Sequence, residues 1–177
     1  MVYRPPRRLQ RNDRLATFEC RSVEQTEWLT HYARQADASG TATVMIVTEA
    51  DTDAVAAYYA WCMASITAAD APERLRRGAG RYPQPVALLA RLGVGVHHER
   101  RGLGAALLFD AISRVSILSE DIGCRGLLVH AETVEAREFY MHLIPEFESS
   151  PTDELHLVLL MKDIRRTLTL PGAKPTT

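Results

Sequence analysis

The residues best placed to do chemistry lie at positions 99–105, where the sequence reads Glu-Arg-Arg-Gly-Leu-Gly-Ala. The stretch 85–96 before them is almost entirely hydrophobic, which is typical of a strand buried on both faces. After them, apolar residues recur at three- and four-residue spacing, which predicts a long helix. Backbone N–H groups at such a turn converge at the positive end of the helix dipole and can bind a phosphate. Gly102 and Gly104 carry no Cβ that would keep a ligand from this backbone.

Two better-known phosphate loops fit this turn poorly. A P-loop requires a Lys-Ser or Lys-Thr pair after its second glycine, where this chain has Ala105 and Ala106. A dinucleotide-binding fingerprint requires a third glycine, where this chain has Leu107. On the glycines alone, a helix start packed closely against a sheet, with no ligand, remains an open alternative.

The rest of the chain supplies the elements that must position this turn. Ser22 and Gln25 have the spacing of a capping box, which predicts a helix that ends at Gly40. Trp28, Leu29, Tyr32 and Ala33 are expected to fall on one face of this helix. Pro5 and Pro6 indicate an N-terminal arm or edge strand. The remaining patterns predict strands at 41–48, 55–66, 85–96, 126–131 and 155–161, and helices after residue 104, at 134–143 and up to about 168.

This order of elements predicts an α/β protein in the broad sense, an α+β mixed sheet flanked by helices. At 177 residues, we expect a single domain over 1–170 and a mobile polar tail over 171–177. The uncharged stretch 54–69 is shorter than a membrane helix, and no export signal is visible, so we expect a cytoplasmic protein that does not enter a membrane.

Composition excludes several other classes of site. The cysteines Cys20, Cys62 and Cys124 are far apart and form no CxxC pair, and the six histidines have no ligand spacing, so we expect neither a disulfide framework nor a metal site. The net charge is −1, yet 19 of the 21 basic residues are arginine. Arginine clusters near residues 4–14 and 74–81 indicate phosphate recognition or, equally, the codon bias of a GC-rich gene.

The turn and its surroundings resemble the GNAT superfamily of N-acetyltransferases. That family carries Gln/Arg-x-x-Gly-x-Gly/Ala between its fourth strand and third helix, and Glu99, Gly102 and Gly104 stand at the fixed positions. The chain resembles most the bacterial toxin acetyltransferases of type II toxin–antitoxin pairs, which acetylate aminoacyl-tRNA. The matching segments are Phe18-Glu-Cys20 with Trp28-Leu29, Pro72-Glu-Arg-Leu-Arg-Arg77, Arg91-Leu-Gly-Val-Gly95, 122–140 and 150–159.

The resemblance implies the GNAT acyl-CoA N-acyltransferase fold, acetyl-CoA as co-substrate and no metal. The residues it implies for cofactor binding are Leu92, Gly93, Val94, Glu99, Arg100, Arg101, Gly102, Leu103, Gly104, Ala105 and Phe139. It also implies that Tyr140 is the acid that protonates the leaving CoA thiolate, whereas its place on an apolar helical stripe alone favours a core tyrosine. A tRNA substrate requires a basic patch, for which we expect the exposed arginines Arg74, Arg76, Arg77 and Arg81, together with Arg91.

The chain departs from the family pattern at three places. Glu99 replaces Gln or Arg and brings a negative charge to the phosphates, for which we expect Arg100 and Arg101 to compensate. Gly95 replaces a commonly acidic residue, and the segment 141–150 is longer than its counterpart and lacks its Gly-Phe pair.

These features favour an acetyl-CoA-dependent N-acetyltransferase, a toxin that acetylates the amino group of aminoacyl-tRNA and so blocks translation. Two alternatives stay open: an acetyltransferase of a protein N-terminus or a small amine, and a weakly active module that binds CoA or a partner. The family likeness also implies a homodimer and a ribbon-helix-helix antitoxin.

Overall fold

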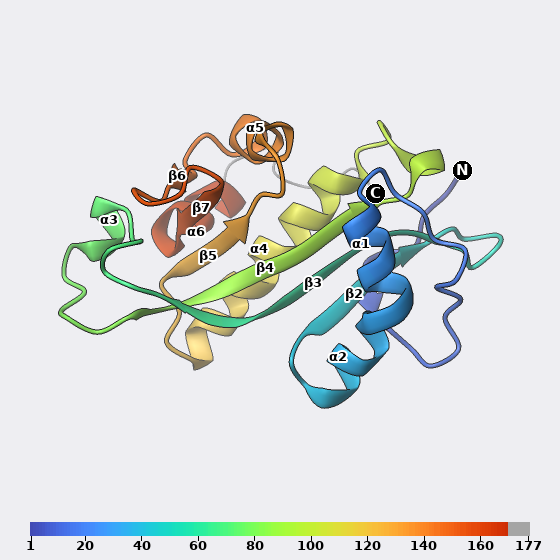
Figure 1. The fold of residues 1–177 in the computed structure, drawn as a ribbon, viewed down its shortest axis with the longest axis horizontal. Helices are drawn as coiled ribbons and strands as arrows, with labels where there is room; N and C mark the ends of the chain where they lie inside the picture. Colours follow the sequence, from blue (N-terminus) through green and yellow to red (C-terminus); the bar gives the residue numbers. More distant parts are fainter. Residues whose placement is uncertain (170–177) are drawn as a thin grey trace. The chain divides into compact units, whose positions relative to one another are not determined.

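The computed structural model describes residues 1–169 of the chain, and the predicted tail at 171–177 lies outside the described residues. Seven strands form a mixed sheet in the order β1-β2-β3-β4-β5-β7-β6, in which β4 and β5 run parallel (Figure 1). The strands are β1 (Arg7–Arg8), β2 (Thr43–Thr48), β3 (Val55–Ile66), β4 (Gln84–Val94), β5 (Gly126–His130), β6 (Glu148–Ser149) and β7 (His156–Leu160). The mixed sheet with its helices confirms the predicted fold class.

The helices follow the predicted pattern with short irregular additions. They are α1 (Val23–Glu27), the π-helical turn η1 (Trp28–Tyr32), α2 (Ala33–Ser39), α3 (Glu73–Arg76), the 3₁₀ turn η2 (Val96–His98), α4 (Leu103–Asp121), α5 (Val134–Leu143) and α6 (Met161–Thr169). In the part of the chain that the model describes, none of these helices is long and apolar enough to cross a membrane.

The first helix begins and ends where the sequence predicts. The Ser22 hydroxyl accepts the Gln25 N–H at 3.1 Å, and Gly40 ends the segment with a φ of 75°. Between them, the Ala33 N–H donates to the Trp28 carbonyl five residues earlier, which makes one π turn. The wider turn changes the angular spacing of the side chains, and of the predicted face Leu29 and Ala33 are buried while Tyr32 is 59% exposed.

The chain forms two compact units, and each is described by itself. Unit 1 comprises Met1–Cys62 and Ala90–Asp110, and unit 2 comprises Met63–Leu89 and the chain from Ala111 onward. In unit 1, consecutive residues of β3 point to opposite faces of the sheet, as a pleated strand requires. The Tyr58 hydroxyl donates to the Gln25 carbonyl of α1 at 2.7 Å, while the Tyr59 hydroxyl donates to Asp110 of α4 at 2.6 Å. Helices therefore cover both faces of β3.

Unit 2 is built on the antiparallel pair β5 and β7, whose register joins Gly126 to Leu160 and His130 to His156. Gly126 is required by packing, because a Cβ there would lie 2.3 Å from the Leu159 carbonyl oxygen. The short strand β6 pairs with β7 and was not predicted, since two residues are too few to give an alternating pattern.

Candidate functional site

The phosphate loop lies in unit 1, between the end of β4 and the start of α4. The predicted strand 85–96 ends at Val94, and residues 96–98 turn as a 3₁₀ helix before Glu99. Arg100 has a φ of 57° and Gly102 a φ of 80°, whereas Arg101 between them is not in the left-handed region. Alternation of this kind can turn successive N–H groups to one side, as in the backbone nests that bind anions, and we refer to Arg100–Gly102 as the nest. The nest is an observation in favour of a ligand-binding turn over a simple helix start.

The first turn of α4 adds further donors. The first helical hydrogen bond that closes this end joins the Ala106 N–H to the Gly102 carbonyl at 3.0 Å. The N–H groups of Leu103, Gly104 and Ala105 precede that bond, so no carbonyl of the helix can accept them. At Gly102 a Cβ would meet nothing within 4 Å, so this glycine is needed for its positive φ rather than for space.

Backbone hydrogen bonds fix the strand end that carries the loop. The Gly95 N–H donates to the Ala56 carbonyl at 2.8 Å, and the Val96 N–H donates to the Glu19 carbonyl at 2.9 Å. One residue inside the strand, a Cβ on Gly93 would lie 2.7 Å from the buried Tyr58 ring. In the described register with β5, β4 pairs only as far as Leu89, so that ladder does not use the backbone of residues 90–94. The predicted residues Leu92, Gly93 and Val94 therefore lie on a part of β4 whose main-chain groups do not take part in the ladder with β5.

Glu99 has an ion-pair partner that the sequence did not indicate. Its carboxylate lies 2.6 Å from the Arg21 guanidinium. Arg100 and Arg101, which we expected to compensate for Glu99, are exposed, and no ion pair joins either of them to Glu99 in the described structure. The cation closest to this acidic position thus comes from the segment before α1, far away in the sequence.

Arg91, predicted to contact tRNA, is engaged within unit 1. Its guanidinium forms an ion pair with Glu24 and lies 5.7 Å from the centre of the Trp28 ring. Trp28 in turn stacks on Tyr58, with ring centres 6.0 Å apart. Arg91 is therefore held over an aromatic surface by a charged pair and a cation–π contact.

Tyr140 and Phe139 lie on α5 in unit 2. Tyr140 is 7% exposed and packs its ring edge-on against Phe139 and Phe147. Its hydroxyl has no hydrogen-bond partner among residues 1–169, although buried tyrosine hydroxyls usually find one. Burial raises the pKa of Tyr140 far above its ordinary value, so the hydroxyl is protonated at physiological pH. An unpartnered, protonated hydroxyl is what a proton donor needs.

The predicted arginine patch is only partly free. Arg76, Arg77 and Arg81 are exposed, but Arg74 is half-buried and forms ion pairs with Glu148 and Asp163. Arg77 also pairs with Glu73, one helical turn away. The expectation that Arg74 is freely exposed is therefore corrected, because two carboxylates of unit 2 already hold it.

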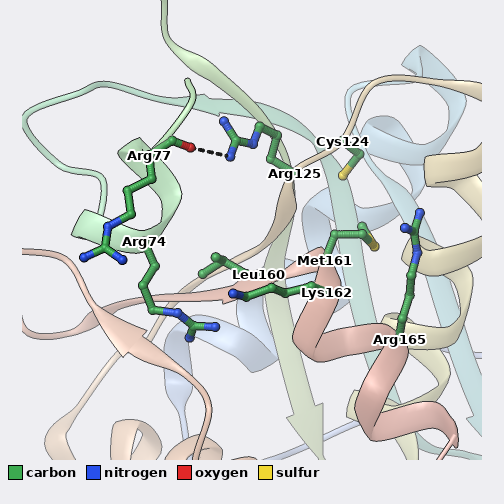
Figure 2. A pocket seen from close by; sticks show the side chains of 8 residues that line it. All are labelled: Arg74, Arg77, Cys124, Arg125, Leu160, Met161, Lys162 and Arg165. Carbon is green, nitrogen blue, oxygen red and sulfur yellow. Dashed lines mark hydrogen bonds between the residues drawn. The ribbon is translucent and has the colours of Figure 1, made fainter. Parts of the chain in front are cut away.

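Arg74 and Arg77 border a hollow of about 550 Å³ that the sequence did not indicate (Figure 2). The other charged side chains that line it come from the residue before β5 and from α6. The lining residues are Arg74, Arg77, Cys124, Arg125, Leu160, Met161, Lys162 and Arg165. Five of these eight are cationic and none is acidic, and Arg125, Lys162 and Arg165 form no ion pair among the described residues. The hollow therefore concentrates positive charge that no carboxylate on its lining cancels.

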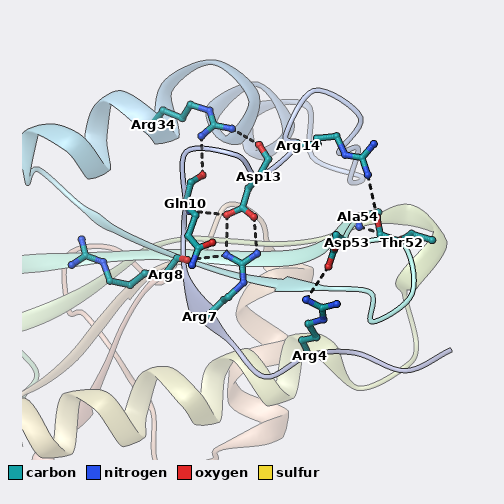
Figure 3. A network of polar contacts seen from close by, with 10 residues as sticks. All are labelled: Arg4, Arg7, Arg8, Gln10, Asp13, Arg14, Arg34, Thr52, Asp53 and Ala54. Atoms are coloured by element: carbon teal, nitrogen blue, oxygen red, sulfur yellow. Dashed lines mark hydrogen bonds and ion pairs between the residues drawn. The ribbon is translucent and has the colours of Figure 1, made fainter.

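Arg4 and Arg7 in the N-terminal cluster serve structural roles (Figure 3). Arg7 donates two hydrogen bonds of 2.9 and 2.6 Å to the Asp13 carboxylate, and Arg4 pairs with Asp53 at 2.9 Å. Burial alone would raise the pKa of Asp13, but the Arg7 guanidinium and the Gln10 N–H hold it below its usual value. These contacts fasten the predicted edge strand β1 within unit 1, whereas Arg11 and Arg14 are exposed and form no ion pair among the described residues.

No group of three His, Cys, Asp or Glu side chains in the described structure is arranged to hold a metal ion. The three cysteines are free thiols in the described structure.

Comparisons with known proteins agree with the mixed sheet. No family model matches the chain. The chain is 40% identical over 163 residues to the tRNA-acetylating toxin of Mycobacterium tuberculosis, a match that covers 92% of this chain and 95% of that one. Its fold is similar to that of AtaT in complex with acetyl-methionyl-tRNAfMet, with a TM-score of 0.85, 22% identity and coverage of 95% and 100%. It is also similar to a tyrosine-to-phenylalanine variant of AtaT bound to the C-terminus of the antitoxin AtaR and acetyl-CoA, with a TM-score of 0.78, 21% identity and coverage of 96% and 100%.

The match to the M. tuberculosis toxin, together with the mixed sheet, identifies an acetyltransferase of the GNAT class. Within this class, the chain belongs to the family of tRNA-acetylating toxins.

We predict that Gly104→Phe weakens acetyl-CoA binding strongly. The added ring would occupy the space where a phosphate meets the first N–H groups of α4. Titration calorimetry with acetyl-CoA on both proteins measures the effect, and thermal melts check that the variant is folded. Equal affinities would place the co-substrate away from this loop.

Proposed function

We propose that the protein transfers the acetyl group of acetyl-CoA to the amino group of an aminoacyl-tRNA, and so removes that tRNA from translation. The observation that carries the proposal is the anion-binding nest at Arg100–Gly102, which lies directly before the open N-terminus of α4. The 40% identity to the M. tuberculosis toxin supports tRNA as the acceptor. The complexes of AtaT with acetyl-CoA and with acetyl-methionyl-tRNAfMet support the same pairing of substrates.

The residues present fit acetyl-CoA. The nest and the N–H groups of Leu103, Gly104 and Ala105 suit its pyrophosphate. The backbone of Leu92–Val94 on β4 is proposed to line the acetyl thioester, where one strand N–H would stabilise a developing negative charge. Acetyl-CoA supplies the activated acyl group when it is bound. An α-amino group has a pKa near ~8, so a useful fraction is already neutral at pH 7 and needs no strong enzymic base.

Tyr140 is proposed as the general acid that protonates the departing thiolate. Its hydroxyl has no hydrogen-bond partner among residues 1–169 and is not among the fully buried unpaired atoms, so a ligand can reach it, and the raised pKa keeps it protonated. Phe139 beside it is proposed to contribute apolar contact to the co-substrate.

The basic hollow of unit 2 is proposed as a contact for tRNA phosphates. Arg77, Arg125, Lys162 and Arg165 reach its rim from three parts of the chain (Figure 2). Phosphate contacts carry most of the affinity for nucleic acid but little sequence information. Exposed Arg76 and Arg81 extend this basic surface, and Arg91 of unit 1 is proposed to meet the tRNA separately.

We propose that an antitoxin binds this protein and regulates its activity. AtaT binds the C-terminus of its antitoxin AtaR, and we propose a comparable antitoxin here, of the ribbon-helix-helix type, together with a homodimeric toxin. The proposed place of action is the cytoplasm, where charged tRNA is used.

The direct test is transfer of labelled acetyl groups from acetyl-CoA to total charged tRNA. Label that appears on the aminoacyl end, and not on protein N-termini or polyamines supplied in parallel, supports the proposal. Label only on the protein or small-amine acceptors would replace it with the second class of acetyltransferase.

We predict that Tyr140→Phe folds normally and binds acetyl-CoA but loses about two or more orders of magnitude in rate, the usual share of acid–base catalysis. Phenylalanine keeps the packing against Phe139 and Phe147 and removes only the hydroxyl. Single-turnover rates measure the loss, and calorimetry and thermal melts are the controls. Turnover within a fewfold of the wild type would make Tyr140 a packing residue.

We further predict that reversing charge at Arg76 and Arg77 to glutamate abolishes tRNA acetylation and leaves acetyl-CoA binding intact. The matched control reverses Arg11 and Arg14 in unit 1, which changes the net charge by the same amount. Acetylation rates at several salt concentrations measure the effect, since lost phosphate contacts flatten the salt dependence. An equal loss in both double variants would show a response to net charge rather than to this surface.

A further inference from the structure

We propose that Arg21, held against Glu99, supplies the positive charge that the phosphate loop needs because its first position is acidic. The inference rests on the proposed function, since the phosphate concerned belongs to acetyl-CoA. It assigns a cofactor-binding role to a residue outside the loop and outside the family motif.

Arg21 and Glu99 form a close ion pair beside the nest. The Arg21 guanidinium lies 2.6 Å from Glu99 Oε2, and only 24% of the Glu99 side chain is exposed. Glu99 immediately precedes Arg100, the first left-handed residue of the nest. An unpaired carboxylate at this position would repel the phosphates that the nest attracts. The ion pair therefore cancels the one charge in the loop that opposes its ligand.

Main-chain contacts on both sides of Arg21 place its backbone beside the loop. The preceding residue, Cys20, forms an isolated antiparallel bridge with Gly95, and the Val96 N–H donates to the Glu19 carbonyl. The following residue, Ser22, caps α1 through its hydroxyl. Arg21 thus lies between a bridge and a helix cap, so its backbone is fixed beside the loop.

The guanidinium keeps donors for a ligand after it has paired with Glu99. Its side chain is 74% exposed, and a guanidinium has five N–H donors in a planar fork suited to phosphate oxygens. Glu99 then has a second effect, because it orients Arg21 toward the loop. The pair together does what the Gln or Arg of the family motif does alone.

The test is a double-mutant cycle read by acetyl-CoA calorimetry. Arg21→Gln leaves the Glu99 carboxylate bare and removes a charge-assisted contact, so affinity should fall about tenfold to a hundredfold. Glu99→Gln in that background removes the repulsion and should restore part of the loss. In steady-state assays, KM for acetyl-CoA should rise while kcat at saturation changes less than twofold.

The matched control is Arg8→Gln, which also removes an exposed arginine–carboxylate pair, with Asp37, in unit 1. It should leave acetyl-CoA affinity unchanged, and melts of all variants show whether any loss comes from unfolding. Affinity of Arg21→Gln within twofold of the wild type would overturn the proposal. A double variant that binds acetyl-CoA no more tightly than Arg21→Gln would also overturn it, because the unpaired Glu99 carboxylate would then not repel the phosphates.

Acetyl-CoA binding by the wild type and by Arg21→Gln separates an error in the role of Arg21 from an error in the proposed function. A wild-type protein that does not bind acetyl-CoA contradicts the proposed function. A wild type and an Arg21→Gln variant that bind it equally well contradict only the role of Arg21.

Discussion

The loop depends on how the end of β4 is tied to its neighbours in unit 1. Gly95 donates to Ala56 of β3, and the next residue donates to Glu19. The chain leaves the sheet at this point and turns through η2 into α4. The bond to Glu19, together with the bridge between Cys20 and Gly95, holds the segment before α1 against the strand end, which brings Arg21 to Glu99. One set of backbone contacts therefore places the nest, the helix N-terminus and the compensating cation.

Tyr58 shows how the helical layer supports this strand. Its ring stacks on Trp28, meets Phe18 edge-on at 5.5 Å and lies against Gly93, while its hydroxyl reaches Gln25. A fully buried ring with this many neighbours has no free direction in which to move. Gly93 has no side chain, so the bulky Tyr58 ring can lie against its backbone. Trp28, the first residue of the π turn, stacks on the same ring.

Much of the architecture could be predicted because local patterns determine it. The β-branched and aromatic residues of 55–66 predicted β3 at its observed bounds, and Ser22 and Gly40 predicted both ends of the first helical segment. Contacts between distant residues could not be found this way. Nothing near Arg21 indicates Glu99, nothing near Arg74 indicates Asp163, and no residue type marks the π turn that precedes the exposed side of the helix. The basic hollow could not be predicted because its cations come from separate elements.

The buried Tyr140 hydroxyl has a consequence for the pH profile of the reaction. General acid–base catalysis often gives a bell-shaped profile, whose falling limb records loss of the proton from the acid. Burial raises the pKa of Tyr140 above its ordinary value, which moves that limb to higher pH. With Tyr140 as the acid, the rate should climb as the acceptor amine deprotonates, and the rising limb would report the aminoacyl group of the tRNA and not the enzyme.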